Sequence, residues 1–353
     1  MTVFGSVRVD RAYYHCRHCG CGQFPRDAGL GLSACVLSRG AAQVVALAGT
    51  LGSFAEAATK VLPAMAGLRV SESTVERTTE RAGQQVGERL AAGETFGPPL
   101  PWTWTPDAEG KTCAYVSADL TGVGMQGPGG SATDGRMAAV GMVWNAGDEG
   151  RVRYVCGLTG GLTALGQPLR RQAEQVGMDA AERWVALSDG GAGIEDWLRR
   201  NFPRVEAVIL DFYHAAEHLC DWAKVLHPQE SEAERVGSQW CHRLKHEGGQ
   251  TVLTALRGLD VSDRSAEVQE AHRQLVVYFE NQVHRMDYPM YRSKGWLIGS
   301  GPVEAACKQV VNQRLKGSGM RWSEPGADAV CHLRALFRSE KSQWDLCWSS
   351  LAV

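Results

Sequence analysis

Five short apolar segments lie between residues 113 and 210, and their order among helical segments constrains the fold more than any other feature of the chain. Short runs rich in Val, Ile, Leu and Ala are typical of strands, and helical periodicity appears only after the third of them. The run Val208-Ile209-Leu210 is typical of a strand buried on both sheet faces. The sequence therefore predicts an α/β domain in the order β-β-β-α-β-α-β. The expected strands are 113–120, 138–145, 151–158, 183–188 and 205–210, with helices near 163–176 and 194–201.

The chain before this region is expected to be mainly helical. One helix is predicted over 53–65 and a second from Ser73, because Ser73 and Glu76 have the spacing of a capping box. With residues 67–70 as the turn, the pair forms either a helix-turn-helix or a plain helical hairpin, and the sequence leaves both open. The proline-rich segment 97–106 is typical of a linker.

A second helical region is expected after the fifth strand. Residues 214–284 are rich in residues that favour helices, which indicates a helical insertion. The chain is expected to return to the sheet at Gly299-Ser-Gly-Pro302, where Pro302 suits the first turn of a helix. The predicted organisation is a partial zinc-ribbon-like segment (1–30), a helix-turn-helix-like DNA-binding region (31–96), a linker (97–110), the α/β core (111–213), the helical insertion (214–294) and a C-terminal catalytic helix with the tail of the core (295–353).

Four acidic residues occupy positions at which an α/β sheet gathers functional groups. Asp119 ends the first expected strand, Asp189 and Asp211 follow the fourth and fifth, and Glu304 lies on the returning helix. Carboxylate oxygens are the ligands that Mg²⁺ prefers, and two-metal phosphoryl transfer needs acids that hold two ions about 4 Å apart. Each acid also has a structural explanation. Asp189 precedes a glycine as in a common turn, and a glutamate near a helix start interacts favourably with the helix dipole.

The net charge of −2 excludes a uniformly basic nucleic-acid-binding protein. The charge is uneven, because residues 1–90 and 284–341 carry more Lys and Arg than Asp and Glu, whereas 91–283 carry the reverse. The basic ends are either solvated faces or surfaces for a polyanion. The sequence has no apolar run of about 18 residues and does not begin like a secretory signal, so we expect a cytoplasmic protein with no membrane contact.

Several motifs together resemble a known family. The segments Ser-Ala-Asp119-Leu-Thr-Gly, Leu-Ser-Asp189-Gly-Gly, Leu-Asp211-Phe-Tyr-His214-Ala-Ala-Glu-His218-Leu and Gly299-Ser-Gly-Pro-Val-Glu304 are similar to those of bacterial insertion-sequence transposases of the Mutator-like DDE group. The resemblance extends over nearly the whole chain, and the last two motifs are the most specific. It implies an RNase H-like catalytic core, which the expected order of strands and helices also fits.

The resemblance implies a role for each acid. Asp119, Asp189 and Glu304 would form a catalytic triad that binds Mg²⁺ or Mn²⁺, with a helical insertion before the glutamate. Counting strands favours Asp189 over Asp211 as the second member, because in the RNase H plan the second acid follows the fourth strand. Asp211 and His214 would then be supporting residues near the metal, orienting DNA or protonating a leaving oxygen.

The chain departs from the family pattern in two places. Leu120 replaces a glycine that more often follows the first aspartate, which leaves the carboxylate intact. Cys16, Cys19 and Cys21 have ligand-like spacing, and Zn²⁺ is a second candidate cofactor there, but relatives usually carry a further cysteine pair upstream. We therefore expect either a partial zinc site, with His15 or His18 as further candidate ligands, or an N-terminally shortened copy.

Basic residues follow Glu304 along the chain. Lys308 lies one turn beyond Glu304 on the same helical face, where it suits phosphate contact as well as solvent. Trp322 suits either base stacking or the core. The candidate DNA-binding residues are Lys308, Arg314, Lys316 and Arg321.

The sequence and the resemblance together predict a DNA transposase that cleaves and joins strands at the terminal inverted repeats of an insertion sequence. The expected partners are those repeats and target DNA, with a homo-oligomer assembled on the DNA and action at the bacterial nucleoid. The alternative is a truncated, catalytically silent DNA-binding relative, which the incomplete cysteine site favours.

Overall fold

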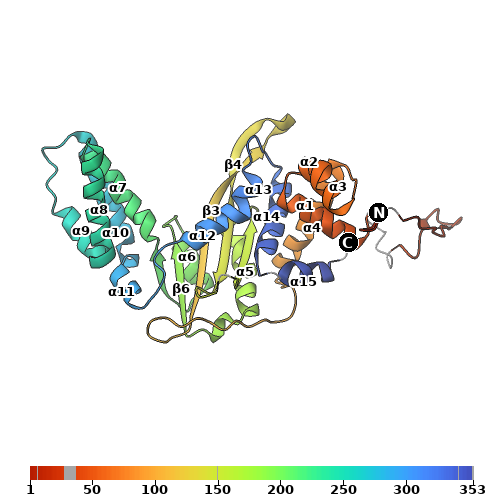
Figure 1. Cartoon of the computed structure of the whole chain (residues 1–353), viewed down its shortest axis with the longest axis horizontal. Helices are drawn as coiled ribbons and strands as arrows, with labels where there is room; N and C mark the ends of the chain where they lie inside the picture. The colour runs from red at the N-terminus through yellow and green to blue at the C-terminus, as the bar shows by residue number, and fades with distance from the viewer. Residues whose placement is uncertain (6, 28–36, 149, 341, 352–353) are drawn as a thin grey trace.

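The computed structural model describes residues 1–5, 7–27, 37–148, 150–340 and 342–351. It is a mixed α/β protein, elongated in Figure 1, with a central sheet between a helical lobe at one end and the N-terminal helices at the other. The N-terminal segment projects from the end opposite the lobe (Figure 1). Among the described residues, no helix is both long and apolar enough to cross a membrane.

The five predicted strands form one sheet in the order β5-β4-β3-β6-β7. The pairs β3–β4 and β4–β5 are antiparallel, whereas β3–β6 and β6–β7 are parallel. This mixed five-stranded arrangement is compatible with the RNase H-like plan expected from the sequence. The strands are β3 (Cys113–Gln126), β4 (Ala132–Trp144), β5 (Val152–Gly157), β6 (Arg183–Ser188) and β7 (Val205–Leu210).

The first two strands are longer than predicted. The parallel pairing of β3 with β6 ends at Ser117, but its antiparallel pairing with β4 continues to Gln126. The two strands form an arm closed by the turn η2 (Pro128–Gly130). Asp119 therefore lies within β3 and not at its end, which corrects the sequence-based expectation. Beyond Asp119 the strand alternates buried Thr121, Val123 and Met125 with exposed Gly122, Gly124 and Gln126, a period-2 pattern that its small and polar residues make weak.

Each face of the sheet is covered by its own hydrophobic core. On one face, Ala114, Val116 and Ala118 of β3 pack with α5 (Gly161–Gln175) and α6 (Ile194–Asn201). On the other face, Cys113 and Tyr115 belong to the core that also contains the C-terminal helices, because alternate strand residues point to opposite sides. Helices therefore cover both faces, as parallel strands require. The remaining elements of these layers are η3 (Met178–Ala180), α12 (Gly301–Ala306), η5 (Cys307–Asn312), α13 (Gln313–Leu315) and α14 (Glu324–Arg338).

The predicted insertion after β7 is helical and forms the lobe at one end of the molecule (Figure 1). Its core contains Leu219, Trp222, Leu244 and Phe279, and it is continuous with one face of the sheet. The buried Arg285 joins the lobe to the sheet by donating hydrogen bonds to the backbone oxygen of Val208 and to the hydroxyl of Ser188. The elements are α7 (Phe212–Leu226), α8 (Glu230–Glu247), α9 (Gly249–Arg257), α10 (Ala266–Gln282), η4 (Val283–Arg285) and α11 (Tyr288–Ser293).

The N-terminal helices differ from the expectation in two details. The helix predicted over 53–65 is present as a continuous run through α2, η1 and α3, but the next helix is capped by Ser71, whose side chain accepts a hydrogen bond from the amide of Thr74. Ser73 lies in the first turn instead of at the cap. The helix over 39–51 was not among those expected. The elements are α1 (Arg39–Leu51), α2 (Phe54–Glu56), η1 (Ala57–Val61), α3 (Leu62–Ala66) and α4 (Glu72–Ala91).

These helices share a hydrophobic core with the end of the chain. The core contains Val75 and Val86 of α4, Leu333 of α14 and Trp348 of α15 (Ser342–Ser350). The sequence predicted residues 31–96 and 295–353 as separate units. In the structure, both ranges contribute to one hydrophobic core. The expected linker also packs closely, because Trp102 and Trp104 are buried against the sheet.

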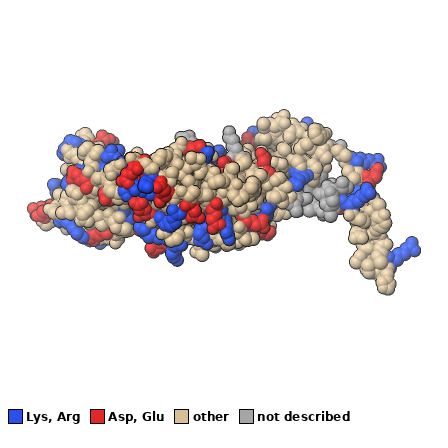
Figure 2. Space-filling model, turned by 90° about the horizontal axis from the view of Figure 1, so that it is seen from below, with Lys and Arg blue, Asp and Glu red and all other residues tan. Residues whose placement is uncertain are grey.

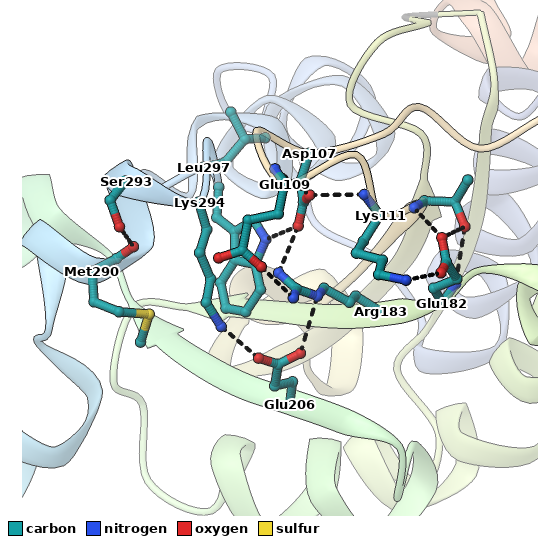
Figure 3. Close-up of polar contacts among 12 residues, drawn as sticks. Asp107, Glu109, Lys111, Glu182, Arg183, Glu206, Met290, Ser293, Lys294 and Leu297 are labelled. Atoms are coloured by element: carbon teal, nitrogen blue, oxygen red, sulfur yellow. Dashed lines mark hydrogen bonds and ion pairs between the residues drawn. The ribbon is translucent and has the colours of Figure 1, made fainter.

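An ion-pair cluster lies at the amino ends of the parallel strands, as Figure 3 shows. Arg183 at the start of β6 contacts Asp107 at 2.8 Å and Glu109 at 2.5 Å, and Lys294 contacts Glu206 of β7 at 2.7 Å. Asp107 also accepts a hydrogen bond from the indole of Trp296. The cluster thus ties the segment that follows the lobe to the sheet. Figure 2 shows that acidic and basic side chains are interspersed over the described part of the face seen from below.

Candidate active site

Three aspartates lie side by side at the carboxyl ends of the parallel pairings. Ser117 of β3 pairs with Leu187 of β6, so extending this register by two residues places Asp119 opposite Asp189. Ser188 of β6 pairs with Leu210 of β7, so the next position places Asp189 opposite Asp211. The amide of Asp211 also donates to the backbone oxygen of Ser188 at 2.9 Å. The register therefore brings together three acids that are far apart in the sequence.

Glu304 approaches these aspartates from α12, which begins at Gly301 with Pro302 in its first turn, as predicted. The buried Ser300 precedes this helix, and its hydroxyl donates to Glu304 Oε1 at 3.0 Å and also contacts Asp211 Oδ2. One serine thus connects the helix that carries Glu304 to the end of β7. Sequence reasoning missed Ser300, although it lies four residues before Glu304, the spacing of one helical turn.

Cys307 is a second neighbour that sequence reasoning missed. Its thiol donates to Asp119 Oδ2 at 3.2 Å, while Asp119 Oδ1 accepts the amide of Leu120 at 2.6 Å. Cys307 lies three residues beyond Glu304 and therefore on the same helical face. The thiol is buried, and desolvation together with the charge of Asp119 raises its pKa well above the usual value. Cys307 is therefore a hydrogen-bond donor to Asp119 at neutral pH.

The acids of the site oppose one another's ionisation. Burial raises the pKa of Asp119, and repulsion from Asp189 adds to this effect, although hydrogen bonds from Cys307 and Leu120 work against it. Burial also raises the pKa of Glu304, with further contributions from Asp211 and Asp119. The ionised carboxylates therefore repel one another in this site, and a bound cation would reduce that repulsion.

Asp211 differs from the other acids in its surroundings. It is only 1% exposed and caps α7 by accepting the amide of Tyr213 at 2.7 Å. Asp119 and Asp189 are half-buried, and Glu304 is exposed. Asp211 thus has local hydrogen-bond partners that explain its position, and its supporting role stays a prediction.

His214 lies on the first turn of α7 and interacts with Asp119, whose pKa burial raises and a positive charge on His214 would moderate. Its ring contacts that of His218, with centroids 5.0 Å apart, and His218 packs on Tyr278 of α10 at 4.0 Å. This aromatic stack holds His214 between the lobe and the acids. It is half-buried, so a ligand at the acids can reach it.

The four candidate DNA-binding residues lie in unlike surroundings. Lys308 and Arg321 are exposed, and Lys316 is exposed while its ammonium donates to Thr121 at 2.7 Å. Arg314 is only 2% exposed.

The guanidinium of Arg314 has contacts of its own inside the protein. It lies 4.8 Å from the ring centroids of both Phe54 and Trp322 and donates to the backbone oxygen of Gly49 at 3.0 Å. This burial leaves no face for a phosphate group, so we leave Arg314 out of the proposed DNA contacts. Trp322 is a core residue in the same contact.

The N-terminal cysteines lie on a small hairpin of β1 (Tyr14–His15) and β2 (Gly22–Gln23). The amide of Cys16 donates to the backbone oxygen of Cys21 at 2.8 Å, and all three thiols are exposed. The backbone of Cys21 and the thiols of Cys16 and Cys21 lower the pKa of Cys19. Among the described residues, no three His, Cys, Asp or Glu side chains already have the arrangement of a metal site. Binding of zinc or magnesium therefore stays a prediction.

Comparison with known proteins adds no assignment, because no family model and no curated protein matches the chain.

Proposed function

We propose that the protein is a metal-dependent DNA transposase that cleaves and joins phosphodiester bonds at the ends of an insertion sequence. The observation that carries the proposal is the register of Asp119, Asp189 and Asp211 on three neighbouring strands, with Glu304 facing them. This arrangement supports the finer description of the sheet as an RNase H-like catalytic core.

The donor set suits hard divalent cations. Asp119, Asp189 and Glu304 offer oxygen ligands, and the raised pKa values of Asp119 and Glu304 mean that a bound Mg²⁺ or Mn²⁺ would offset their repulsion. When bound, such ions polarise the attacking water and neutralise charge on the leaving 3′ oxygen. Ser300 and Cys307 orient Glu304 and Asp119. We further propose that His214, which interacts with Asp119, donates a proton to a leaving oxygen.

Lys308, Lys316 and Arg321 follow Glu304 in the sequence and are exposed, so we propose them as contacts to the phosphates of the bound strand. We propose that the N-terminal helices bind the terminal repeats. Because they share a core with α14, DNA bound there would be held rigidly relative to the acids.

The test is Mn²⁺- or Mg²⁺-dependent cleavage of a duplex that carries the ends flanking the gene. Asp119→Asn, Asp189→Asn and Glu304→Gln should each lower the cleavage rate by 100-fold or more, on the order expected for lost electrostatic stabilisation. Glu234→Gln, which changes an exposed carboxylate on α8, is the matched control and should cleave normally. Full activity in any of the three variants would remove that residue from the triad.

A second readout separates activity from metal binding. Mn²⁺ should raise the melting temperature of the wild type, and the rise should shrink in Asp119→Asn and Glu304→Gln. A wild-type protein that binds its DNA ends but neither responds to Mn²⁺ nor cleaves would favour the catalytically silent DNA-binding alternative.

A further inference from the structure

Two cysteines of the helical lobe lie in side-chain contact although they are far apart in the sequence. Cys220 is on α7 and Cys241 is on α8, and their sulfur atoms are 3.6 Å apart. Both side chains are half-buried, so small reagents can reach them from solvent. Neither residue takes part in the proposed reaction.

The two helices are packed tightly where these residues meet. A Cβ added at Gly237 of α8 would lie 3.3 Å from the Cys220 sulfur and 3.4 Å from the Cys220 Cα, so only glycine leaves this spacing undisturbed. One turn further along α8, the Cys241 thiol donates to the backbone oxygen of Ala216 at 3.6 Å. The pair therefore lies where α7 and α8 pack closely together.

Another pair of cysteines offers a comparison within the same molecule. Cys156 of β5 and Cys331 of α14 also have interacting thiols, but both side chains are 0% exposed. An oxidant dissolved in water reaches this second pair only if the core opens. The two cysteine pairs therefore differ in their access to solvent, although the thiols interact within each pair.

We propose that Cys220 and Cys241 are a modification site, at which a low-molecular-weight disulfide such as oxidised glutathione introduces a reversible disulfide bond between α7 and α8. In the first step one protein thiolate attacks the reagent, its sulfur–sulfur bond breaks, and one glutathione leaves as a thiolate that takes up a proton. The second protein thiol then loses its proton, its sulfur attacks the mixed disulfide, and the second glutathione leaves. Two protein thiols are oxidised and one reagent disulfide is reduced to two thiols.

The surroundings indicate which cysteine reacts first. Burial, and then the neighbouring Cys220, raise the pKa of Cys241 to about 12, so its thiolate is scarce at neutral pH. Cys220 is therefore the attacking residue and Cys241 the resolving one. Because Asp211 caps α7 and His214 lies on its first turn, the bond would also fix this helix beside the candidate site.

The experiment uses the full-length protein and does not depend on the proposed function. The native protein is incubated with oxidised glutathione at pH 7.5 and alkylated, and its peptides are mapped by mass spectrometry without reduction. We expect a cross-linked peptide that contains Cys220 and Cys241, lost on treatment with dithiothreitol. The Cys156 and Cys331 peptides should stay uncross-linked, which makes them the internal control. Peptides are counted instead of total thiols, because the exposed Cys16, Cys19 and Cys21 also react.

Two single substitutions test the separate roles of Cys220 and Cys241. Cys241→Ser should leave Cys220 as a stable mixed disulfide with glutathione, whereas Cys220→Ser should leave Cys241 largely unmodified. Wild type should melt at a higher temperature after oxidation, and neither variant should. The proposal is overturned if Cys220 and Cys241 stay free or singly modified in the wild type, or if the Cys156–Cys331 cross-link forms equally.

Discussion

At the residue scale, Ser300 shows how one side chain affects two acids. Its hydroxyl contacts carboxyl oxygens of both Asp211 and Glu304, but a hydroxyl group has only one hydrogen to donate. The carboxyl group of Glu304 therefore gains from holding a proton of its own, which agrees with its pKa, raised by burial and then by Asp211. A metal ion bound beside Glu304 would replace that proton.

Asp119→Asn should raise the melting temperature of the metal-free protein at pH 7.5. Burial, followed by repulsion from Asp189, raises the folded-state pKa of Asp119, so the wild type is stabilised below the unfolded pKa of about 3.9 and loses that stability as pH rises through the folded pKa. Asparagine removes this loss while its side-chain oxygen still accepts the Leu120 amide. The measurement is thermal unfolding in EDTA between pH 4 and 8.

The advantage of the variant should shrink as pH falls through the raised folded-state pKa of Asp119 and should vanish below the unfolded pKa of about 3.9. Glu234→Gln, on the lobe surface, is the control and should change the melting temperature little at any pH. A variant that is less stable than wild type at pH 7.5 would contradict the electrostatic account of Asp119.

At the scale of elements, the contact between α4 and α14 holds the N-terminal helices against the rest of the protein. Glycines on α4 make it possible, because Gly83 lies against the backbone of Ala329 and Gly87 lies against the ring of His332. Helices that approach this closely have no room for a side chain at the crossing point. The sequence pattern of α4 predicted a helix but could not identify this partner.

Gly83→Ala should destabilise the protein by about 1–3 kcal/mol or more, as overpacking does. The added Cβ would lie 2.1 Å from the backbone oxygen of Ala329, so one of the helices must move. Chemical denaturation of the two proteins measures the difference.

Gly40→Ala on α1 is the matched control, because among the described residues its added Cβ would meet Val3 alone, at an ordinary 3.6 Å. This change should be neutral or stabilising, by up to about 1 kcal/mol, because alanine favours helices. Equal effects of the two substitutions would show that helix propensity, and not the contact with α14, governs the Gly83 position.

At the scale of the whole molecule, different groups lie at the two ends of the parallel strands. The carboxyl ends gather Asp119, Asp189 and Asp211, whereas the amino ends carry the ion-pair cluster of Figure 3. Lys294 and Trp296 of that cluster lie on the segment between the lobe and Glu304. The cluster therefore fixes the path along which the chain returns from the lobe to the site.

Asp107→Asn should destabilise the protein at neutral pH by about 1–3 kcal/mol, because it breaks a buried, charge-assisted contact with Arg183. Burial opposes ionisation of Asp107, but hydrogen bonds from Trp296 and from the amides of Lys111 and Glu109, together with Arg183, lower its pKa. The stabilisation is therefore present above the unfolded pKa of about 3.9 and is lost as pH falls through the lower folded pKa.

Denaturation at several pH values tests this expectation, and the difference between wild type and Asp107→Asn should close only in acid. Glu182→Gln, in the exposed pair with Lys111, is the control and should have little effect. A pH-independent difference would indicate that packing, and not the charge of Asp107, is the cause.

Local patterns in the sequence were sufficient to predict the five strands of the sheet and the helical character of the lobe. All five strands were predicted, because the spacing of apolar residues reports whether a segment is a strand or a helix. The acids could be placed at one edge of the sheet for the same reason, since strand order determines which strand ends meet. The helix that carries Glu304 was predicted from the segment Gly299-Ser-Gly-Pro302, in which Pro302 suits the first turn.

Only the tertiary structure decided which residues far apart in the sequence contact one another. Arg314 looked like a DNA contact because its charge and position suit one, but Gly49, Phe54 and Trp322 surround it. Strand β3 continues past Asp119 because β4 pairs with it, and Ser300 and Cys307 belong to the site because η5 and α12 pack on the sheet. Such contacts join residues far apart in the chain, so no local pattern records them. The sequence by itself determined which segments form the central strands and which acids lie near them, because both depend on local pattern, whereas packing decided how far β3 continues, which charges are buried and which remain available to a ligand.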